Sequence, residues 1–184
     1  MTTRAEYTAS LLDAARSSIG IRETAHNNEP EIDQWLEYIH ARPGDPWCAA
    51  WVCGMHRQAA VALDIPNPCP RTAGALRLWD LTLPECRQQF PAPGDVFVLD
   101  TGAPGGAGHV GIIEAVSPDG RTLTTIEANT NSAGSREGDC VARHTWNPSV
   151  GSRGKLVGYL QLVLAVLPET ESFPPGLPKS PFDR

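Results

Sequence analysis

In the first half of the chain, apolar residues recur every three or four positions, which is the spacing of one face of an α-helix. This pattern predicts helices over residues 6–19 and 30–39. A third segment, residues 47–63, is apolar on nearly all sides and predicts a buried helix with Cys48 in its first turn. A short helix is expected over residues 72–81.

In the second half, the helical period gives way to patterns typical of β-strands. Strands are expected at 95–100, 109–116, 121–128, 141–146 and 156–167. The sequence Ser-Pro-Asp-Gly at 117–120 favours a tight turn, so the two strands beside it should form a hairpin. The chain is therefore predicted to be α+β, with one domain over residues 1–167.

The last 17 residues, 168–184, include five prolines, and we expect them to form an extended tail without a core of its own. The first ten residues contain charges and hydroxyls but no apolar segment like that of a signal peptide. We therefore expect synthesis in the cytoplasm without a cleaved leader.

The charge balance argues against two classes of partner. The 184 residues contain 15 Lys and Arg against 21 Asp and Glu, a net charge of −6, so the surface as a whole does not attract nucleic acid or anionic lipid. The most apolar run, residues 156–167, is shorter than the roughly 20 residues that a membrane-spanning helix needs. We expect no nucleic-acid binding and no membrane insertion.

The five cysteines are an odd number, so at least one thiol stays unpaired. Cys69 and Cys86 could form a disulfide in an oxidising compartment, but the pairing stays open at this point. Cys53 and His56 have the spacing of two metal ligands on a helix, yet no second pair of ligands accompanies them. We expect no metal and no cofactor.

Cys48 differs from the other cysteines because it opens a predicted helix, where backbone N–H groups and the helix dipole stabilise a thiolate. A thiolate nucleophile needs a base nearby, and the hairpin offers His109. A four-residue turn would place His109 opposite Ala128. A shift of one residue would put it on the face shared by Glu127 and Asn129.

Gly108 and Gly111 flank His109 and leave space beside the imidazole. Another element, such as the helix of Cys48, could therefore approach this strand closely. Asn129 could instead belong to a turn, since Asn favours such positions.

The chain contains Gly44-Asp-Pro-Trp-Cys-Ala-Ala-Trp-Val52, Pro93-Gly-Asp-Val-Phe-Val98, Gly108-His-Val-Gly-Ile-Ile113 and Ile126-Glu-Ala-Asn-Thr-Asn131. In this order and spacing, the motifs resemble those of the CHAP and NlpC/P60 superfamily of papain-like peptidoglycan hydrolases. The resemblance implies N-terminal helices packed on an antiparallel sheet of about five or six strands, with the nucleophile at the N-terminus of the central helix.

Carried over by motif position, the resemblance implies Cys48 as nucleophile, His109 as base, and Glu127 as the group that orients the imidazole, with Asn129 as a further polar residue. Many CHAP enzymes have Gln before the nucleophile, where it contributes to the oxyanion pocket. Trp47 occupies that place here, so the second oxyanion donor stays open. We consider Trp47 and Gly108 as substrate-binding candidates.

The implied activity is hydrolysis of an amide bond in bacterial peptidoglycan, either between the lactyl group of the sugar and L-Ala or within the stem peptide. The alternatives are a Cys-His acyl transferase, a protein deamidase, or a catalytically inactive wall-binding module. A phage lysin delivered through a holin and a secreted interbacterial effector with an immunity protein are both compatible with the sequence. We expect a monomer.

Overall fold

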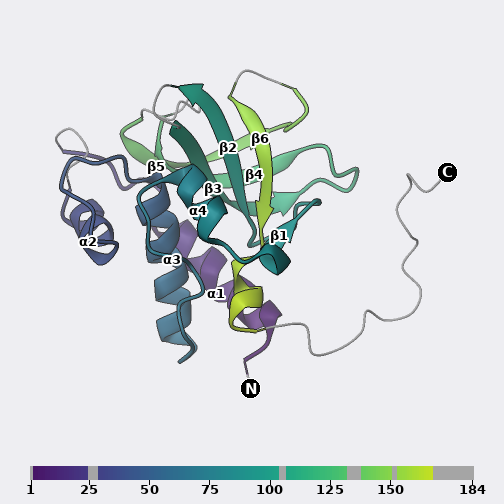
Figure 1. The fold of residues 1–184 in the computed structure, drawn as a ribbon, viewed down its shortest axis with the longest axis horizontal. Helices are drawn as coiled ribbons and strands as arrows, with labels where there is room; N and C mark the ends of the chain where they lie inside the picture. The colour runs from purple at the N-terminus through teal and green to yellow at the C-terminus, as the bar shows by residue number, and fades with distance from the viewer. Residues whose placement is uncertain (1, 25–28, 104–106, 132–137, 151–152, 168–184) are drawn as a thin grey trace.

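The computed structural model describes residues 2–24, 29–103, 107–131, 138–150 and 153–167, to which the structural statements below refer. It has the predicted α+β architecture, with helices packed against one antiparallel sheet (Figure 1). The prediction of a tail at 168–184 lies outside the described residues.

Four α-helices form where the apolar periodicity predicted them, within three residues at either end. Their bounds are α1 Arg4–Ser17, α2 Pro30–Tyr38, α3 Cys48–Ala62 and α4 Ala75–Leu81. Helix α1 begins with a capping box, in which the Thr3 hydroxyl accepts from the Glu6 N–H and the Glu6 carboxylate accepts from the Thr3 N–H.

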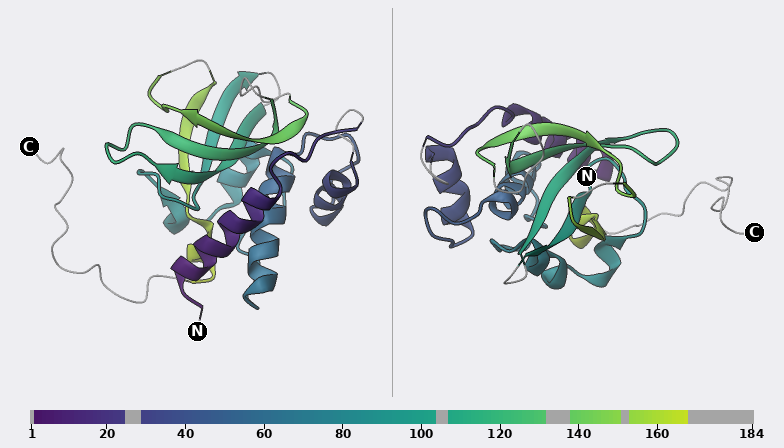
Figure 2. Two further views of the ribbon diagram at one scale, coloured as in Figure 1. Left: turned by 180° about the vertical axis from the view of Figure 1, so that it is seen from behind. Right: turned by 90° about the horizontal axis from the view of Figure 1, so that it is seen from above.

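Helix α3 is the central helix, as the pattern of residues 47–63 predicted. It contacts α1, α2, α4 and the strands β3 and β4, so almost every face of its first half is buried. Small residues permit this close packing: a Cβ on Gly54 would lie 2.5 Å from Cδ1 of Trp35 on α2. Figure 2 shows α1 and α3 side by side beneath the curved sheet.

The sheet has six strands in the order β1-β6-β2-β3-β4-β5, and all neighbours are antiparallel. The strands are β1 Arg87–Gln88, β2 Val96–Ala103, β3 Ala107–Val116, β4 Leu123–Thr130, β5 Cys140–Trp146 and β6 Lys155–Leu160. One face of the sheet buries Val96, Val98 and Ile112 against the helices, and the other buries Phe97, Leu99 and Ile113 in a smaller cluster.

Two details of the second half differ from the sequence prediction. The strand expected at 156–167 ends at Leu160, and the chain continues into a 3₁₀ helix at Leu162–Ala165. The two-residue strand β1, preceded by a 3₁₀ turn at Pro84–Cys86, was not predicted because two residues are too short to show any periodicity.

The hairpin of β3 and β4 is longer at its turn than predicted. Gly120 donates to the Ser117 carbonyl, as in the predicted tight turn, but Val116 faces Leu123 rather than Arg121. An irregularity in the pairing between Ile113 and Ala115 then shifts the register again. Gly111 therefore lies opposite Glu127, one residue away from the four-residue-turn count.

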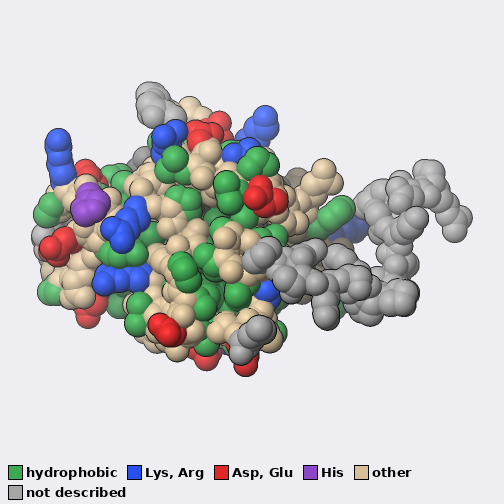
Figure 3. Space-filling view, turned by 60° about the horizontal axis from the view of Figure 1, so that its bottom comes forward, with side chains coloured by type: hydrophobic (Ala, Val, Ile, Leu, Met, Phe, Trp, Pro, Cys, Tyr) green, Lys and Arg blue, Asp and Glu red, His purple; other side chains and the backbone are tan. Residues whose placement is uncertain are grey.

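On the face drawn in Figure 3, side chains of both charge signs are interspersed with hydrophobic ones. The excess of acidic residues does not gather into one acidic patch on this face. Among the described residues, no helix has the length and apolar character needed to cross a membrane.

Candidate functional site

Cys48 is the first residue of α3 and lies where this helix meets the sheet. The residue is 6% exposed. Burial raises the pKa of its thiol, but the His109 imidazole and the backbone N–H groups of Val110 and Ala49 outweigh burial, and the net pKa is lowered. The free N–H groups of a helix start act in the same direction. The surroundings of Cys48 therefore favour the thiolate, as the sequence predicted.

His109 lies near the beginning of β3 and is 2% exposed. Its Nε2–H donates to Oε2 of Glu127 at 2.8 Å. Its Nδ1 has no well-aligned hydrogen bond to any described residue, and is the ring nitrogen left for the Cys48 thiol. Burial lowers the pKa of the imidazole, but Cys48 and Glu127 outweigh it and raise this pKa to about 9. Together, these shifts favour an ion pair of thiolate and imidazolium.

Glu127 lies within β4 and is fully buried. A buried carboxylate requires several donors, and Glu127 has them: His109 on Oε2, and the Thr125 hydroxyl on Oε1 at 2.6 Å. Burial raises the pKa of this carboxyl group, but His109 and Arg153 outweigh it and lower the pKa to about 2. Glu127 is therefore a carboxylate at any pH at which the protein would work.

Gly111 provides the space that Glu127 needs. His109 lies two residues before Gly111 on β3, so its side chain projects to the same side of the sheet as that of Glu127, which faces Gly111. A Cβ on Gly111 would lie 2.7 Å from both Cγ of Glu127 and Cε1 of Phe97. The absence of a side chain at position 111 lets Glu127 extend along the sheet to His109.

Arg153 is a site residue that the sequence analysis missed. It precedes β6, and its NH1 donates to Oε1 of Glu127 at 3.0 Å while NH2 donates to Oε2. The contact joins residues 26 positions apart, and an arginine between strands has no spacing or motif that would mark it. Only the folded structure reveals this pair.

Asn129 lies beside the start of α3, where its side chain contacts the backbone. Its Oδ1 accepts from the Trp47 N–H at 3.3 Å, one residue before Cys48. The backbone of Asn129 is left-handed, with φ of 55°, which Asn tolerates better than most residues. Asn129 therefore links β4 to the helix that begins with Cys48.

Trp47 does not line a groove in this structure. The residue is fully buried, its ring stacks on Trp35 with centroids 5.9 Å apart, and its Nε1–H donates to Glu23 at 2.8 Å. The Trp47 ring, a candidate for binding substrate on the sequence alone, packs in the core instead. Trp47 fixes the start of α3 from the side of α2.

Gly108 has a packing role that differs in part from the predicted one. A Cβ at this position would lie 2.6 Å from the Leu99 carbonyl oxygen and 3.1 Å from both Ala75 and Leu76. The element that comes close to Gly108 is therefore α4, rather than the helix of Cys48. The residue remains half-buried.

All five cysteines are free thiols. Cys69 does not form the bridge to Cys86 that the sequence left open, and its thiol interacts instead with Cys53. The described residues contain no group of three or more His, Cys, Asp or Glu side chains arranged for a metal ion.

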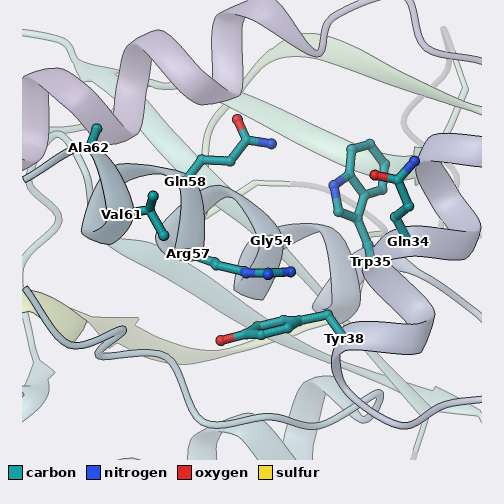
Figure 4. A pocket seen from close by; sticks show the side chains of 8 residues that line it. All are labelled: Gln34, Trp35, Tyr38, Gly54, Arg57, Gln58, Val61 and Ala62. Atoms are coloured by element: carbon teal, nitrogen blue, oxygen red, sulfur yellow. The ribbon is translucent and has the colours of Figure 1, made fainter. Parts of the chain in front are cut away.

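A pocket between α2 and the second half of α3 is separate from these residues. Arg57 lies over the Tyr38 ring with its guanidinium carbon 4.2 Å from the ring centroid, and Trp35 lies at the other side of the pocket (Figure 4). Neither Cys48 nor His109 contributes to its lining.

Comparison with protein families gives one match, the CHAP domain, over residues 40–129. The matched segment begins before α3 and ends at Asn129, so it includes Cys48, His109 and Glu127. Neither the curated proteins nor the solved structures compared with the chain include a match. CHAP domains are typical of peptidoglycan hydrolases and amidases, whose substrate is peptidoglycan. Residues 40–129 of this chain are therefore similar to CHAP domains.

Proposed function

We propose that the protein is a cysteine-dependent amidohydrolase that cleaves an amide bond of bacterial peptidoglycan, with Cys48, His109 and Glu127 as its catalytic residues. The observation that supports this most strongly is the interaction of the Cys48 thiol with the His109 imidazole, whose Nε2–H is bound by buried Glu127. A nucleophile, a base and an orienting carboxylate in series are the elements of acyl transfer by a thiolate.

In the first half of the reaction, His109 accepts the Cys48 proton and the sulfur attacks the amide carbonyl carbon. A carbon–sulfur bond forms, and the carbonyl electron pair moves to the oxygen. The backbone N–H at the start of α3 is a donor for this oxyanion. When the carbonyl re-forms, the carbon–nitrogen bond breaks and His109 gives its proton to the leaving amine.

In the second half, water attacks the thioester. His109 takes one proton from the water, a carbon–oxygen bond forms, and the carbon–sulfur bond breaks as the carboxylic product leaves. The proton held by His109 restores the Cys48 thiol or its ion pair. Throughout both halves, Glu127 accepts from Nε2 and stabilises the positive ring.

Digestion of purified sacculi tests this proposal. We expect the wild-type protein to release soluble muropeptides, with mass spectrometry showing a new amine and a new carboxyl group at one bond. Cys48→Ala should abolish this release. Cys86→Ala, a matched removal of another buried thiol, should retain it. Release by Cys48→Ala at the wild-type rate would overturn the mechanism.

The same products distinguish the alternative activities. An acyl transferase would yield a product joined to a second amine rather than to water, and a protein deamidase would leave peptidoglycan intact. A wall-binding module without activity would sediment with sacculi but release nothing. The position of the cleaved bond, at the lactyl group or within the stem peptide, follows from the mass of the fragments.

Because peptidoglycan lies outside the cytoplasmic membrane, we propose that the protein acts in the periplasm or cell wall after delivery by a holin or a secretion system. Expression with an added export signal should lyse a bacterial host, and expression of the Cys48→Ala variant with the same signal should not. Lysis without export would contradict this location. Co-expression of neighbouring genes would identify an immunity protein by its suppression of lysis.

A further inference from the structure

Arg153 forms the only described ion pair of Glu127 with a permanently charged side chain. Both of its terminal nitrogens donate to the carboxylate, one to each oxygen. The Arg153 side chain is 18% exposed, and Glu127 is fully buried. Such bidentate contacts are the strongest and most directional that a carboxylate accepts, so they fix its rotation as well as its position.

Arg153 is itself held in place by the second hydrophobic cluster. Its guanidinium carbon lies 5.0 Å from the centroid of the Trp146 ring. The Nε1–H of Trp146 donates at 3.2 Å to the Thr125 hydroxyl, which donates in turn to Oε1 of Glu127. Trp146, Thr125 and Arg153 thus all act on one carboxylate.

The donors are shared evenly between the two oxygens of Glu127. Oε1 accepts from Thr125 and Arg153, and Oε2 accepts from His109 and Arg153. If Arg153 were absent, the carboxylate could rotate about its last bond, and Oε2 would no longer be held in line with Nε2 of His109. Its negative charge would also act on the imidazole without a competing cation.

We propose that Arg153 is a positioning residue of the reaction. It holds the Glu127 carboxylate in line with His109, and the negative charge of Glu127 is then shared between Arg153 and the imidazole. This inference rests on the proposed function, because it assumes that His109 is the base. Arg153 does not exchange protons itself, since a guanidinium stays charged in proteins. Its effect on catalysis passes entirely through Glu127.

The other titratable groups near this pair are Cys48 on α3 and His144 on β5. Burial lowers the pKa of His144, and Glu127, Arg153 and His109 act on it as well. The Thr130 hydroxyl contacts Nε2 of His144 at 3.3 Å. Any pH measurement on Arg153 variants should therefore be repeated with His144→Gln, which removes this second titration.

The test compares Arg153→Met with Arg143→Met. Arg143 also binds a carboxylate through two nitrogens, that of Glu114, but on the exposed side of β5. Two readouts are needed: kcat and KM on solubilised peptidoglycan, and the rate at which iodoacetamide alkylates Cys48 between pH 5 and 10. Alkylation requires no substrate, so it reports on Arg153 even if peptidoglycan is the wrong substrate.

For Arg153→Met, we expect kcat to fall roughly ten- to a hundredfold with KM changed less than about twofold, because the ring of His109 is misplaced while substrate contacts stay. The alkaline limb of the activity profile and of the alkylation profile should move up by about half a pH unit or more, since the charge of Glu127 then acts on the imidazolium alone. Arg143→Met should leave kcat and the alkaline limbs of both profiles unchanged.

Arg153→Lys provides a second variant if the methionine protein does not fold. Lysine keeps the positive charge but cannot make the bidentate contact of the guanidinium with the carboxylate. The kcat should therefore fall, while the alkaline limb should shift less than with Met. The proposal is overturned if folded Arg153 variants keep the wild-type limb, or if KM rather than kcat accounts for the loss, which would indicate a contact with substrate. Absence of peptidoglycan cleavage by the wild type would refute the proposed function instead.

Discussion

Gly111 on β3 lies directly opposite Glu127 on β4, and a Cβ at Gly111 would come within 2.7 Å of Cγ of Glu127. The glutamate occupies the space that a side chain at position 111 would fill. The contact between Glu127 and His109 therefore depends on a residue that takes no part in the chemistry.

Gly111→Ala should displace Glu127 or Phe97. We expect it to lower the free energy of unfolding by about 1–3 kcal/mol, the usual cost of an overpacked interior. It should also reduce kcat at least about tenfold, because Glu127 no longer orients His109. Urea unfolding and sacculus digestion measure the two effects. Gly74→Ala, a substitution at the start of α4, is the control, and full activity in Gly111→Ala would contradict the packing argument.

Glu127→Gln should lower the pKa of His109, because the carboxylate charge that stabilises the imidazolium is lost. The ion pair then loses its proton at a lower pH, so the alkaline limb of kcat/KM should move down from near 9. We expect activity to fall roughly a hundredfold or more. Glu114→Gln, which alters a different carboxylate, one bound by Arg16 and Arg143, should leave the limb in place. An unchanged limb in Glu127→Gln would disprove the role of this charge.

Asn129 should matter for stability through both its side chain and its backbone. Asn129→Ala removes the acceptor for the Trp47 N–H, and Ala tolerates left-handed backbone less well than Asn. We therefore expect the free energy of unfolding to fall by about 2 kcal/mol. Asn129→Gly removes the same acceptor without the backbone strain and should recover about half of that loss. Thermal unfolding compares the two, and equal stabilities would eliminate the backbone contribution.

Asp95, immediately before β2 and 1% exposed, should make stability depend on pH. Burial raises its pKa to about 7, against the opposing effects of the Ala92 N–H and the Gln161 side chain. The unfolded chain loses this proton near pH 4 and the folded chain near 7, so the group lowers stability as pH rises between these values.

Asp95→Asn has no such titration. The difference in free energy of unfolding between this variant and the wild type should therefore grow in the variant's favour from pH 4 to 7 and level off above, reaching a few kcal/mol at most. Urea unfolding at pH 4.5, 6 and 7.5 measures it, with exposed Asp13→Asn as control. A difference independent of pH would refute the titration of Asp95.

The sequence predicted the helices and most strands because their apolar residues follow one regular period, as in α2 and in β3. It predicted the grouping of Cys48, His109 and Glu127 because each belongs to a short motif in a regular element. The register of the hairpin was off by one residue, since neither the extra turn residues before Leu123 nor the irregularity beside Ile113 changes the alternation of the strands enough to be seen.

Other parts of the site depend on contacts that only folding creates. Arg153 meets Glu127 across the sheet from an irregular segment, where no periodicity constrains a side chain. Trp47 was a candidate for substrate binding because an aromatic residue at a helix start has the same sequence pattern whether it faces solvent or the core. Its stacking on Trp35 decides between the two.

The pH dependence of Cys48 alkylation tests the central claim most directly, because it asks whether this thiol is activated by His109 without assuming any substrate. Iodoacetamide labelling followed by peptide mass spectrometry should show Cys48 reacting at a pH well below the ordinary thiol pKa of 9, and His109→Ala should lose this reactivity. A wild-type Cys48 that reacts only near pH 9, or equally with and without His109, would contradict the account.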